Sequence, residues 1–255
     1  MKLVALVFFN CFCMAYVWTQ APIYTSLNGH SHNDYTQKKP FNTAFKSRMG
    51  SIEADVYLIG DTLYVAHERT EIKPTHTLES LYLKPLAKAI KKGKCYPLQL
   101  MIDVKTGGDS TLKAIVRQIE QYSIVFEGKN PVILLISGNR PKPENWLSYP
   151  SFIQFDGRPN ETYTPEQWQK VGLVSDNFMR YTNQEHKEIS HETVFQKMKT
   201  MIETSHTRGK KVRFWATSDD PSVWKTLMAM GVDFINTDAP KNLKKFIGKA
   251  RKHKT

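Results

Sequence analysis

Residues 28–69 read NGHSHNDYTQKKPFNTAFKSRMGSIEADVYLIGDTLYVAHER, and this stretch predicts both a strand and a site. The run from Ser51 to Ile59 is largely apolar but carries two acidic residues, Glu53 and Asp55, two positions apart. Residues at that spacing on a strand share one face. Because buried carboxylates need partners, their presence in an apolar strand indicates a functional site rather than a plain core.

Three histidines flank this acidic strand. His30 and His32 follow a short apolar strand predicted over 24–29, and His67 follows a hairpin arm predicted over 62–66. Counting along the hairpin brings His67 level with Ala54, between the two carboxylates. Strict pairing would place its side chain on the face of Ala54, so we expect a bulge or a strand end to turn it toward them.

Short apolar strands alternate with amphipathic helices along the rest of the chain. We predict helices over 77–92, 110–122, 191–207, 222–230 and from 242 onward, and strands over 97–104, 132–136, 152–155, 171–174, 211–216 and 233–235. With the hairpin arm set apart there are eight strands, and such alternation implies parallel strands joined by crossover helices. The sequence therefore predicts an α/β fold, a single (β/α)8 TIM-type barrel. An open doubly wound sheet is the alternative, but no Gly-rich phosphate loop follows the first strand.

The N-terminus has the pattern of a secretory signal peptide. Lys2 precedes an apolar run that ends in small or polar residues near Ala21. The run is short for a membrane span, and no basic flank follows it. We therefore expect residues 1–21 to be a signal peptide, residues 22–255 to form one domain, and the protein to be exported, either secreted or periplasmic. Cys95 would then be the only cysteine left, so the fold would depend on its core rather than on a disulfide.

In a barrel of this type the reactive residues lie at the carboxyl ends of the strands. The strand over 97–104 ends at Asp103, with Lys105 just beyond it, and the strand over 211–216 holds Trp215. Together with the carboxylates of the acidic strand, Asp103 forms a hard, oxygen-rich set that suits one divalent cation, Mg²⁺ or Ca²⁺. A lysine beside such an ion suits a phosphoryl oxygen. A structural ion pair is the alternative for Asp103 and Lys105.

Several motifs together resemble a known superfamily. GHSHNDY, PFNTAF, SIEADVYL, LYVAHE, LMIDVKT and a late INTDAP look like the glycerophosphodiester phosphodiesterase and phosphatidylinositol phospholipase C-like barrel phosphodiesterases. PFNTAF stands where those enzymes carry Pro-Glu-Asn-Thr, and IEADV is similar to their metal-binding Glu-x-Asp strand. The match is dense in the first third of the chain and weak at the last strand. The HSHNDY form resembles a branch that includes the fungal altered-inheritance-of-mitochondria proteins.

The resemblance implies a role for each candidate residue. It assigns acid-base catalysis to His30 and His67, the divalent cation to Glu53, Asp55 and Asp103, and phosphate and substrate contacts to Lys105 and Trp215. His32 is a second-rank candidate, which orients His30, touches phosphate or packs. Two departures from the family pattern, Ser31 in place of Arg and Asp103 in place of Glu, argue against a plain glycerophosphodiesterase substrate.

The residues and the resemblance together predict a metal-dependent phosphoric diester hydrolase acting on a glycerophosphodiester or (lyso)phospholipid-like substrate. Two imidazoles that flank a phosphodiester can act in turn as base and acid. A neighbouring hydroxyl on the substrate would favour a first attack that forms a cyclic phosphate, with or without later ring opening by water.

Two other functions fit parts of the sequence. An HxH pair also occurs in metal-dependent hydrolases of the amidohydrolase and polymerase-and-histidinol-phosphatase types, but these need more histidines at later strand ends. The net charge of +12 and the basic tail from Asn242 also fit a non-catalytic barrel that binds anionic lipid or a polyanion. We expect a small phosphodiester or phospholipid ligand, a contact of the tail with an anionic membrane, a monomer, and no nucleic acid, since no recognition motif accompanies the charge.

Overall fold

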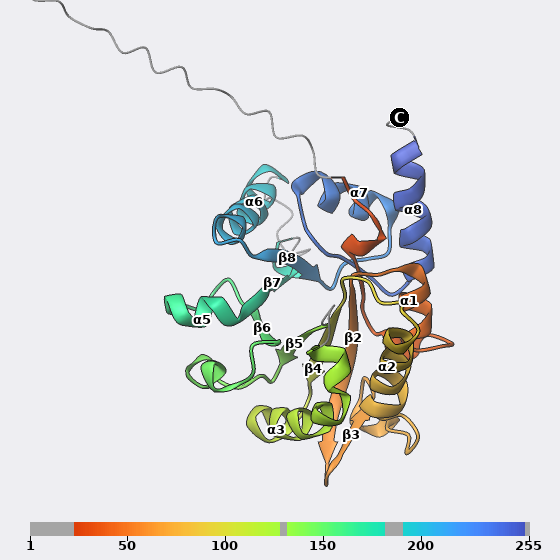
Figure 1. Cartoon of the computed structure of the whole chain (residues 1–255). Helices are drawn as coiled ribbons and strands as arrows, with labels where there is room; N and C mark the ends of the chain where they lie inside the picture. The colour runs from red at the N-terminus through yellow and green to blue at the C-terminus, as the bar shows by residue number, and fades with distance from the viewer. Residues whose placement is uncertain (1–22, 128–131, 182–190, 253–255) are drawn as a thin grey trace, which may run out of the picture.

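A computed structural model describes residues 23–127, 132–181 and 191–252 of the chain (Figure 1). Its strands are β1 (Gly29–Ser31), β2 (Ser51–Ile59), β3 (Thr62–Val65), β4 (Gln99–Val104), β5 (Ile133–Gly138), β6 (Ile153–Gly157), β7 (Val171–Asn177), β8 (Lys211–Trp215) and β9 (Ile235–Thr237). Its α-helices are α1 (Asn42–Ser47), α2 (Lys84–Lys91), α3 (Gly108–Ile119), α4 (Ser123–Phe126), α5 (Pro165–Lys170), α6 (His191–Thr207), α7 (Pro221–Met230) and α8 (Pro240–Lys252).

The strands form a nearly closed barrel. Eight of them follow the order β8-β7-β6-β5-β4-β2-β1-β9 with parallel pairing, and β3 pairs antiparallel with β2 outside this path. A parallel bridge between Arg213 and Phe234 joins β8 to the segment before β9. The helices lie around the outside of the strands (Figure 1). The predicted (β/α)8 barrel is therefore confirmed.

The first strand lies later in the chain than the sequence predicted. Residues Ser26–Asn28 form a short 3-10 turn, η1, and β1 begins only at Gly29. The Thr25 hydroxyl accepts a hydrogen bond from the Leu27 amide at 3.2 Å, and the Asn28 side-chain oxygen accepts one from the Thr25 amide at 3.0 Å. This capping box satisfies the backbone locally, so the apolar run before Gly29 does not need a strand partner. The displacement leaves His30 on β1 and His32 just beyond its end.

A small apolar layer fills the barrel below the strand ends. Met101, Leu135, Leu173 and Phe234 are buried together, and they come from β4, β5, β7 and the segment before β9. Two residues further along the first three of these strands stand polar side chains on the same face, namely Asp103, Ser137 and Ser175. The barrel is thus packed with apolar side chains in its middle and is polar at the carboxyl ends of its strands. Active sites of this architecture lie at that end.

The last helix, α8, covers the outside of the barrel with one face. Leu243 and Ile247 are buried, whereas Lys241, Lys245 and Lys249 are exposed. Within the described ranges, no helix is long and apolar enough to cross a membrane. The signal peptide predicted over residues 1–21 lies outside the described residues.

Candidate active site

Three carboxylates from two neighbouring strands converge at the carboxyl end of the barrel. Asp55 on β2 stands opposite Asp103 on β4 in the parallel pairing, and Glu53 precedes Asp55 by two residues. One oxygen of each of the three carboxylates lies within 4.8 Å of the others. Asp55 Oδ1 and Asp103 Oδ1 are buried and have no hydrogen-bond partner among the described residues. Three carboxylates this close together, two of them with a buried unpartnered oxygen, have the chemistry of a site for a hard divalent cation.

Lys105 is the cation that the structure places beside this cluster. Its Nζ lies 2.9 Å from Asp55 Oδ2 and 2.7 Å from Asp103 Oδ2. Burial raises the pKa of Asp55 to about 7, the Glu53 charge adds to that increase, and Lys105 opposes it. Burial likewise raises the pKa of Asp103. Lys105 contacts the two aspartates and Arg213 contacts Glu53, yet the pKa values of both aspartates are still raised, so a further cation there would stabilise their ionised forms.

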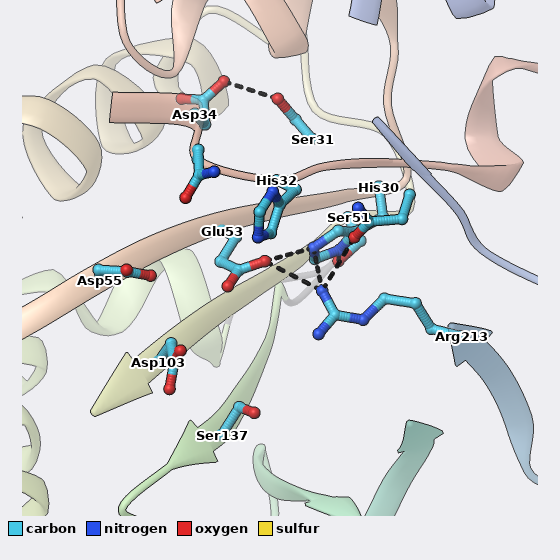
Figure 2. A network of polar contacts seen from close by, with 12 residues as sticks. His30, Ser31, His32, Asp34, Ser51, Glu53, Asp55, Asp103, Ser137 and Arg213 are labelled. Atoms are coloured by element: carbon cyan, nitrogen blue, oxygen red, sulfur yellow. Dashed lines mark hydrogen bonds and ion pairs between the residues drawn. The ribbon is translucent and has the colours of Figure 1, made fainter. Parts of the chain in front are cut away.

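His30 is held inside the barrel by a polar network (Figure 2). The ring is fully buried, its Nδ1 lies 2.7 Å from Ser51 Oγ, and its Nε2 lies 2.6 Å from Glu53 Oε2. Arg213 Nη1 contacts the same Nε2 and donates to Glu53 Oε2 at 2.9 Å. Burial, and then the Arg213 charge, lower the pKa of His30 to about 4. Both ring nitrogens are thus occupied by the protein, and His30 is a neutral residue that positions Glu53.

His32, unlike the buried His30, is partly exposed to the pocket. It lines the pocket above the carboxylates, and its side chain is 27% exposed. Nδ1 lies 2.7 Å from Asp238 Oδ1, and no described residue forms a hydrogen bond with Nε2. Burial lowers the pKa of His32, but the hydrogen bond to Asp238 and the Glu53 charge outweigh burial and raise it overall. An imidazole with one nitrogen held by a carboxylate and the other open to a pocket suits proton transfer.

The structure places His67 near the cluster but does not join it to the site. The Ala66 amide donates to the Asp55 carbonyl at 3.3 Å, so the loop after β3 runs beside the acidic cluster. The His67 side chain is 55% exposed, and its Nδ1 lies 3.5 Å from Glu68 Oε1. Neither a bulge nor the end of β3 turns the ring to the carboxylates in this structure. Its acid-base role therefore stays a prediction.

A pocket of about 430 Å³ opens over these residues. Its lining comprises His32, Glu53, Asp103, Lys105, Ser137, Gly138, Asp156, Arg158, Asn160, Ser175, Asp176, Arg180, Arg213 and Trp215. Trp215, at the end of β8, is 39% exposed and lines this pocket. Its contact with a substrate stays a prediction. The volume lies within the usual range for a small-molecule site.

Sequence reasoning missed Arg213. It lies between Val212 and Phe214 on β8, and all three side chains are buried. The spacing Lys211, Arg213, Trp215 follows one face of a strand, and this period-two pattern could have placed Arg213 in the barrel interior with Trp215. Pairing it with Glu53 was beyond such reasoning, because the two residues are 160 positions apart.

Gly138, at the end of β5, lines the pocket beside Asp103. Its φ is +68°, and a Cβ placed on it would lie 1.8 Å from Asp103 Oδ1 and 2.6 Å from the Val104 carbonyl oxygen. Only glycine combines that conformation with such close approach. The residue therefore leaves room for the unpartnered Asp103 oxygen.

The comparisons with known proteins agree with this geometry. Residues 19–97 match the model of the AIM6-like phosphodiesterase domain, and residues 211–241 match that of the glycerophosphoryl diester phosphodiesterase family. A protein of Arthroderma benhamiae, called Altered inheritance of mitochondria protein 6 homolog, is 27% identical over 252 residues, which cover 82% of this chain and 80% of its own. Altered inheritance of mitochondria protein 6 of Eremothecium gossypii is 25% identical over 267 residues, covering 85% of this chain and 68% of its own.

Two solved structures share the fold. A glycerophosphodiester phosphodiesterase from Parabacteroides distasonis superimposes with a TM-score of 0.56 at 17% identity, covering 89% of this chain and 96% of that one. One from Agrobacterium tumefaciens superimposes with a TM-score of 0.51 at 15% identity, covering 87% and 96%. The resemblance that the motifs predicted is confirmed, and the chain has the barrel fold of these phosphodiesterases.

Proposed function

From this likeness and from the site, we propose that the protein is a metal-dependent phosphoric diester hydrolase acting on a glycerophosphodiester or (lyso)phospholipid-like substrate. The observation that carries the proposal is the convergence of Glu53, Asp55 and Asp103 within 4.8 Å at the edge of a pocket that also holds an open imidazole and a lysine. Carboxylates, imidazole and ammonium in one cavity are the groups that phosphodiester hydrolysis uses.

Glu53, Asp55 and Asp103 would hold one Mg²⁺ or Ca²⁺. The unpartnered oxygens of Asp55 and Asp103 support this assignment, and so does the absence of sulfur from the donor set. A divalent cation bound there would offset negative charge on the phosphoryl oxygens. Within the described residues, the one cluster of potential metal ligands contains no histidine, which argues against a multi-histidine hydrolase of the amidohydrolase type.

His32 takes the proton-transfer role that the sequence assigned to His30. With Nδ1 held by Asp238, the open Nε2 can remove a proton from the attacking hydroxyl or water. His30, with both nitrogens occupied, instead helps to position the Glu53 carboxylate, because it and Arg213 both contact Glu53 Oε2. His67 is the expected acid for the leaving alkoxide, and it would reach the substrate after its loop turns inward.

Lys105 would bind the phosphate. Its side chain is 27% exposed and its ammonium already lies at the pocket. A phosphoryl oxygen can accept one of its three donors while the aspartates keep the others. A hydroxyl next to the scissile bond would attack first and give a cyclic phosphate, which ³¹P NMR distinguishes from the opened ester.

The proposal is tested by hydrolysis of bis(p-nitrophenyl) phosphate, glycerophosphocholine and glycerophosphoglycerol with Mg²⁺, with Ca²⁺ and with EDTA. We expect metal-dependent turnover of at least one of these, reduced about 100-fold or more in His32→Asn and in Glu53→Gln. Glu120→Gln, an exposed acidic residue outside the pocket, is the matched control and should behave as wild type. Folded wild-type protein without turnover of any diester would rule the proposal out.

A further inference from the structure

Two arginines stand at the pocket, away from the acidic cluster. Arg158 is the first residue after β6, and Arg180 ends the 3-10 turn η7 (Phe178–Arg180), which follows β7. Because β6 and β7 pair, both arginines lie at adjacent strand ends. In the strand order, β7 is separated from β2 by three strands, so in the round barrel this rim faces the Glu53 and Asp55 strand across the pocket.

Each guanidinium keeps hydrogen-bond donors that are not paired with another described residue. Arg158 Nη2 donates to the Gly138 carbonyl at 2.8 Å, and its Nη1 lies 3.5 Å from Glu161 Oε1. Glu161 is already neutralised by Arg140, whose side chain is only 5% exposed. The side chain of Arg158 is 48% exposed, so most of its five donors remain open to the pocket and solvent.

Arg180 is similarly available. Its Nη1 donates to Asp176 Oδ1 at 3.0 Å, while its side chain is 59% exposed. Asp176 also accepts a hydrogen bond from the Tyr181 hydroxyl at 2.8 Å, so Asp176 does not depend on Arg180 alone. Guanidinium groups with open donors in a cavity bind carboxylate and phosphate in forked geometry.

The pocket has room for more than the reacting phosphate. Its volume of about 430 Å³ extends from the acidic cluster to the arginine rim, and Lys105 lies on the acidic side. The reacting phosphate would therefore be held by groups distinct from Arg158 and Arg180. The rim is left for another part of the same substrate.

We propose that Arg158 and Arg180 form a second anion-binding subsite, which selects phosphodiesters whose alcohol carries a further carboxylate or phosphate. This inference rests on the proposed phosphodiesterase function and narrows its substrate class. Asp156 and Asp176 also line the pocket, but both are buried, so a ligand at this rim meets chiefly the exposed guanidinium groups. An anion there gains charge-assisted hydrogen bonds.

The test compares three diesters of glycerol phosphate that differ only in the end group of a three-carbon alcohol: 3-hydroxypropionate, 3-hydroxypropyl phosphate and 1,3-propanediol. Each is assayed with Mg²⁺ on wild type, on the double variant Arg158→Gln/Arg180→Gln and on Arg117→Gln, whose arginine is exposed on α3 outside the pocket. Circular dichroism checks that each variant is folded. The readout is the ratio of kcat/KM for each anionic diester to that for the neutral one.

We expect wild type and Arg117→Gln to prefer an anionic diester by about tenfold or more, and the double variant to lose that preference. The better of the carboxylate and the phosphate identifies the end group. Equal kcat/KM for all three diesters in wild type, or a preference that survives in the double variant, would overturn the subsite. An equal loss for all three would also overturn it, because the arginines would then serve the reacting phosphate.

Absence of turnover is a separate outcome, since it contradicts the proposed function rather than the subsite. In that case, calorimetric titration of the same three diesters into the same proteins decides the question. A dissociation constant about tenfold lower for an anionic diester, lost in the double variant, supports the subsite. Equal dissociation constants refute it.

Discussion

Asp34 is a buried carboxyl group close to the site but outside the metal cluster. It accepts hydrogen bonds from Ser31 Oγ at 3.0 Å and from the Phe41 amide. Burial raises its pKa to about 6, although those two donors oppose the increase. The folded protein therefore binds a proton at Asp34 over a pH range in which the unfolded chain has released it.

This difference predicts a stability change with a definite sign. The folded-state pKa of Asp34 exceeds the unfolded value. Its contribution to the free energy of unfolding is therefore present below pH 4 and falls by about 3 kcal/mol in all as pH rises through about 6. Urea unfolding of wild type and Asp34→Asn at pH 4 and pH 7 isolates it, because asparagine does not titrate. Between pH 4 and pH 7 the advantage of wild type over the variant should shrink by about 2 kcal/mol, because part of the full amount is already lost at pH 4. A difference that does not change with pH would contradict the raised pKa.

At the residue scale, the sequence placed His30 and His32 together after the first strand but could not tell that His30 is buried and that His32 faces the pocket. The difference depends on Ser51, Arg213 and Asp238, which meet the two rings through tertiary contacts. Asp238 is 206 residues from His32, so no local sequence pattern predicts that these two residues pair.

At the element scale, the acidic strand was predictable because its pattern is local. The boundaries predicted for Ser51–Ile59 agree with β2, and the register between β2 and β4 sets Asp55 directly opposite Asp103. The first and last strands were misplaced, and each is only three residues long. Before the first strand, the capped turn η1 competes with extended backbone. Short strands depend on partners more than on their own composition.

Gly138, at the end of β5, can be substituted to test whether the backbone there supports the position of Asp103. In Gly138→Ala, the new methyl group would meet Asp103 Oδ1 and the Val104 carbonyl, so we expect a loss of about 2 to 4 kcal/mol in unfolding free energy and weaker binding of Mg²⁺. Urea unfolding and calorimetry measure the two effects.

Gly209→Ala is the matched control for Gly138. Gly209 has a φ of +66°, and nothing lies within 4 Å of a Cβ placed there. It should show only the cost of the left-handed conformation, about 1 kcal/mol, with unchanged Mg²⁺ binding. Equal effects of the two substitutions would show that crowding at Asp103 is not the reason for the glycine.

At the scale of the whole molecule, Arg213 links β8 and β9, the two edge strands of the sheet that forms the barrel. From β8 it contacts His30 on β1 and Glu53 on β2, and its Nη1 lies 3.5 Å from Asn236 Oδ1 on β9. The barrel is only nearly closed between β8 and β9, so these contacts add to the Arg213–Phe234 bridge and to the hydrogen bonds between Val212 and Asp233. The eight-strand architecture could be predicted from alternation, but this closure could not, since it depends on residues from opposite ends of the chain.

Arg213→Met tests this closure, because it keeps the length of the side chain and removes its charge. We expect a loss of about 3 to 5 kcal/mol in unfolding free energy, since the buried Glu53 charge is left without its partner. Adding Glu53→Gln should restore part of the loss. Arg117→Met, at an exposed position on α3, should change little. Independent, additive losses for the two buried residues would mean that the ion pair does not couple them.

The central claim is that the Glu53, Asp55 and Asp103 cluster holds the divalent cation on which phosphodiester hydrolysis depends. The most direct measurement is the hydrolysis of bis(p-nitrophenyl) phosphate while Mg²⁺, or in parallel Ca²⁺, is titrated into EDTA-treated wild type and Asp103→Asn. We expect no turnover before the metal is added, saturable turnover in wild type, and a metal requirement in Asp103→Asn that is at least about tenfold higher. Turnover that persists in EDTA, or identical metal dependence in the two proteins, would contradict the central claim.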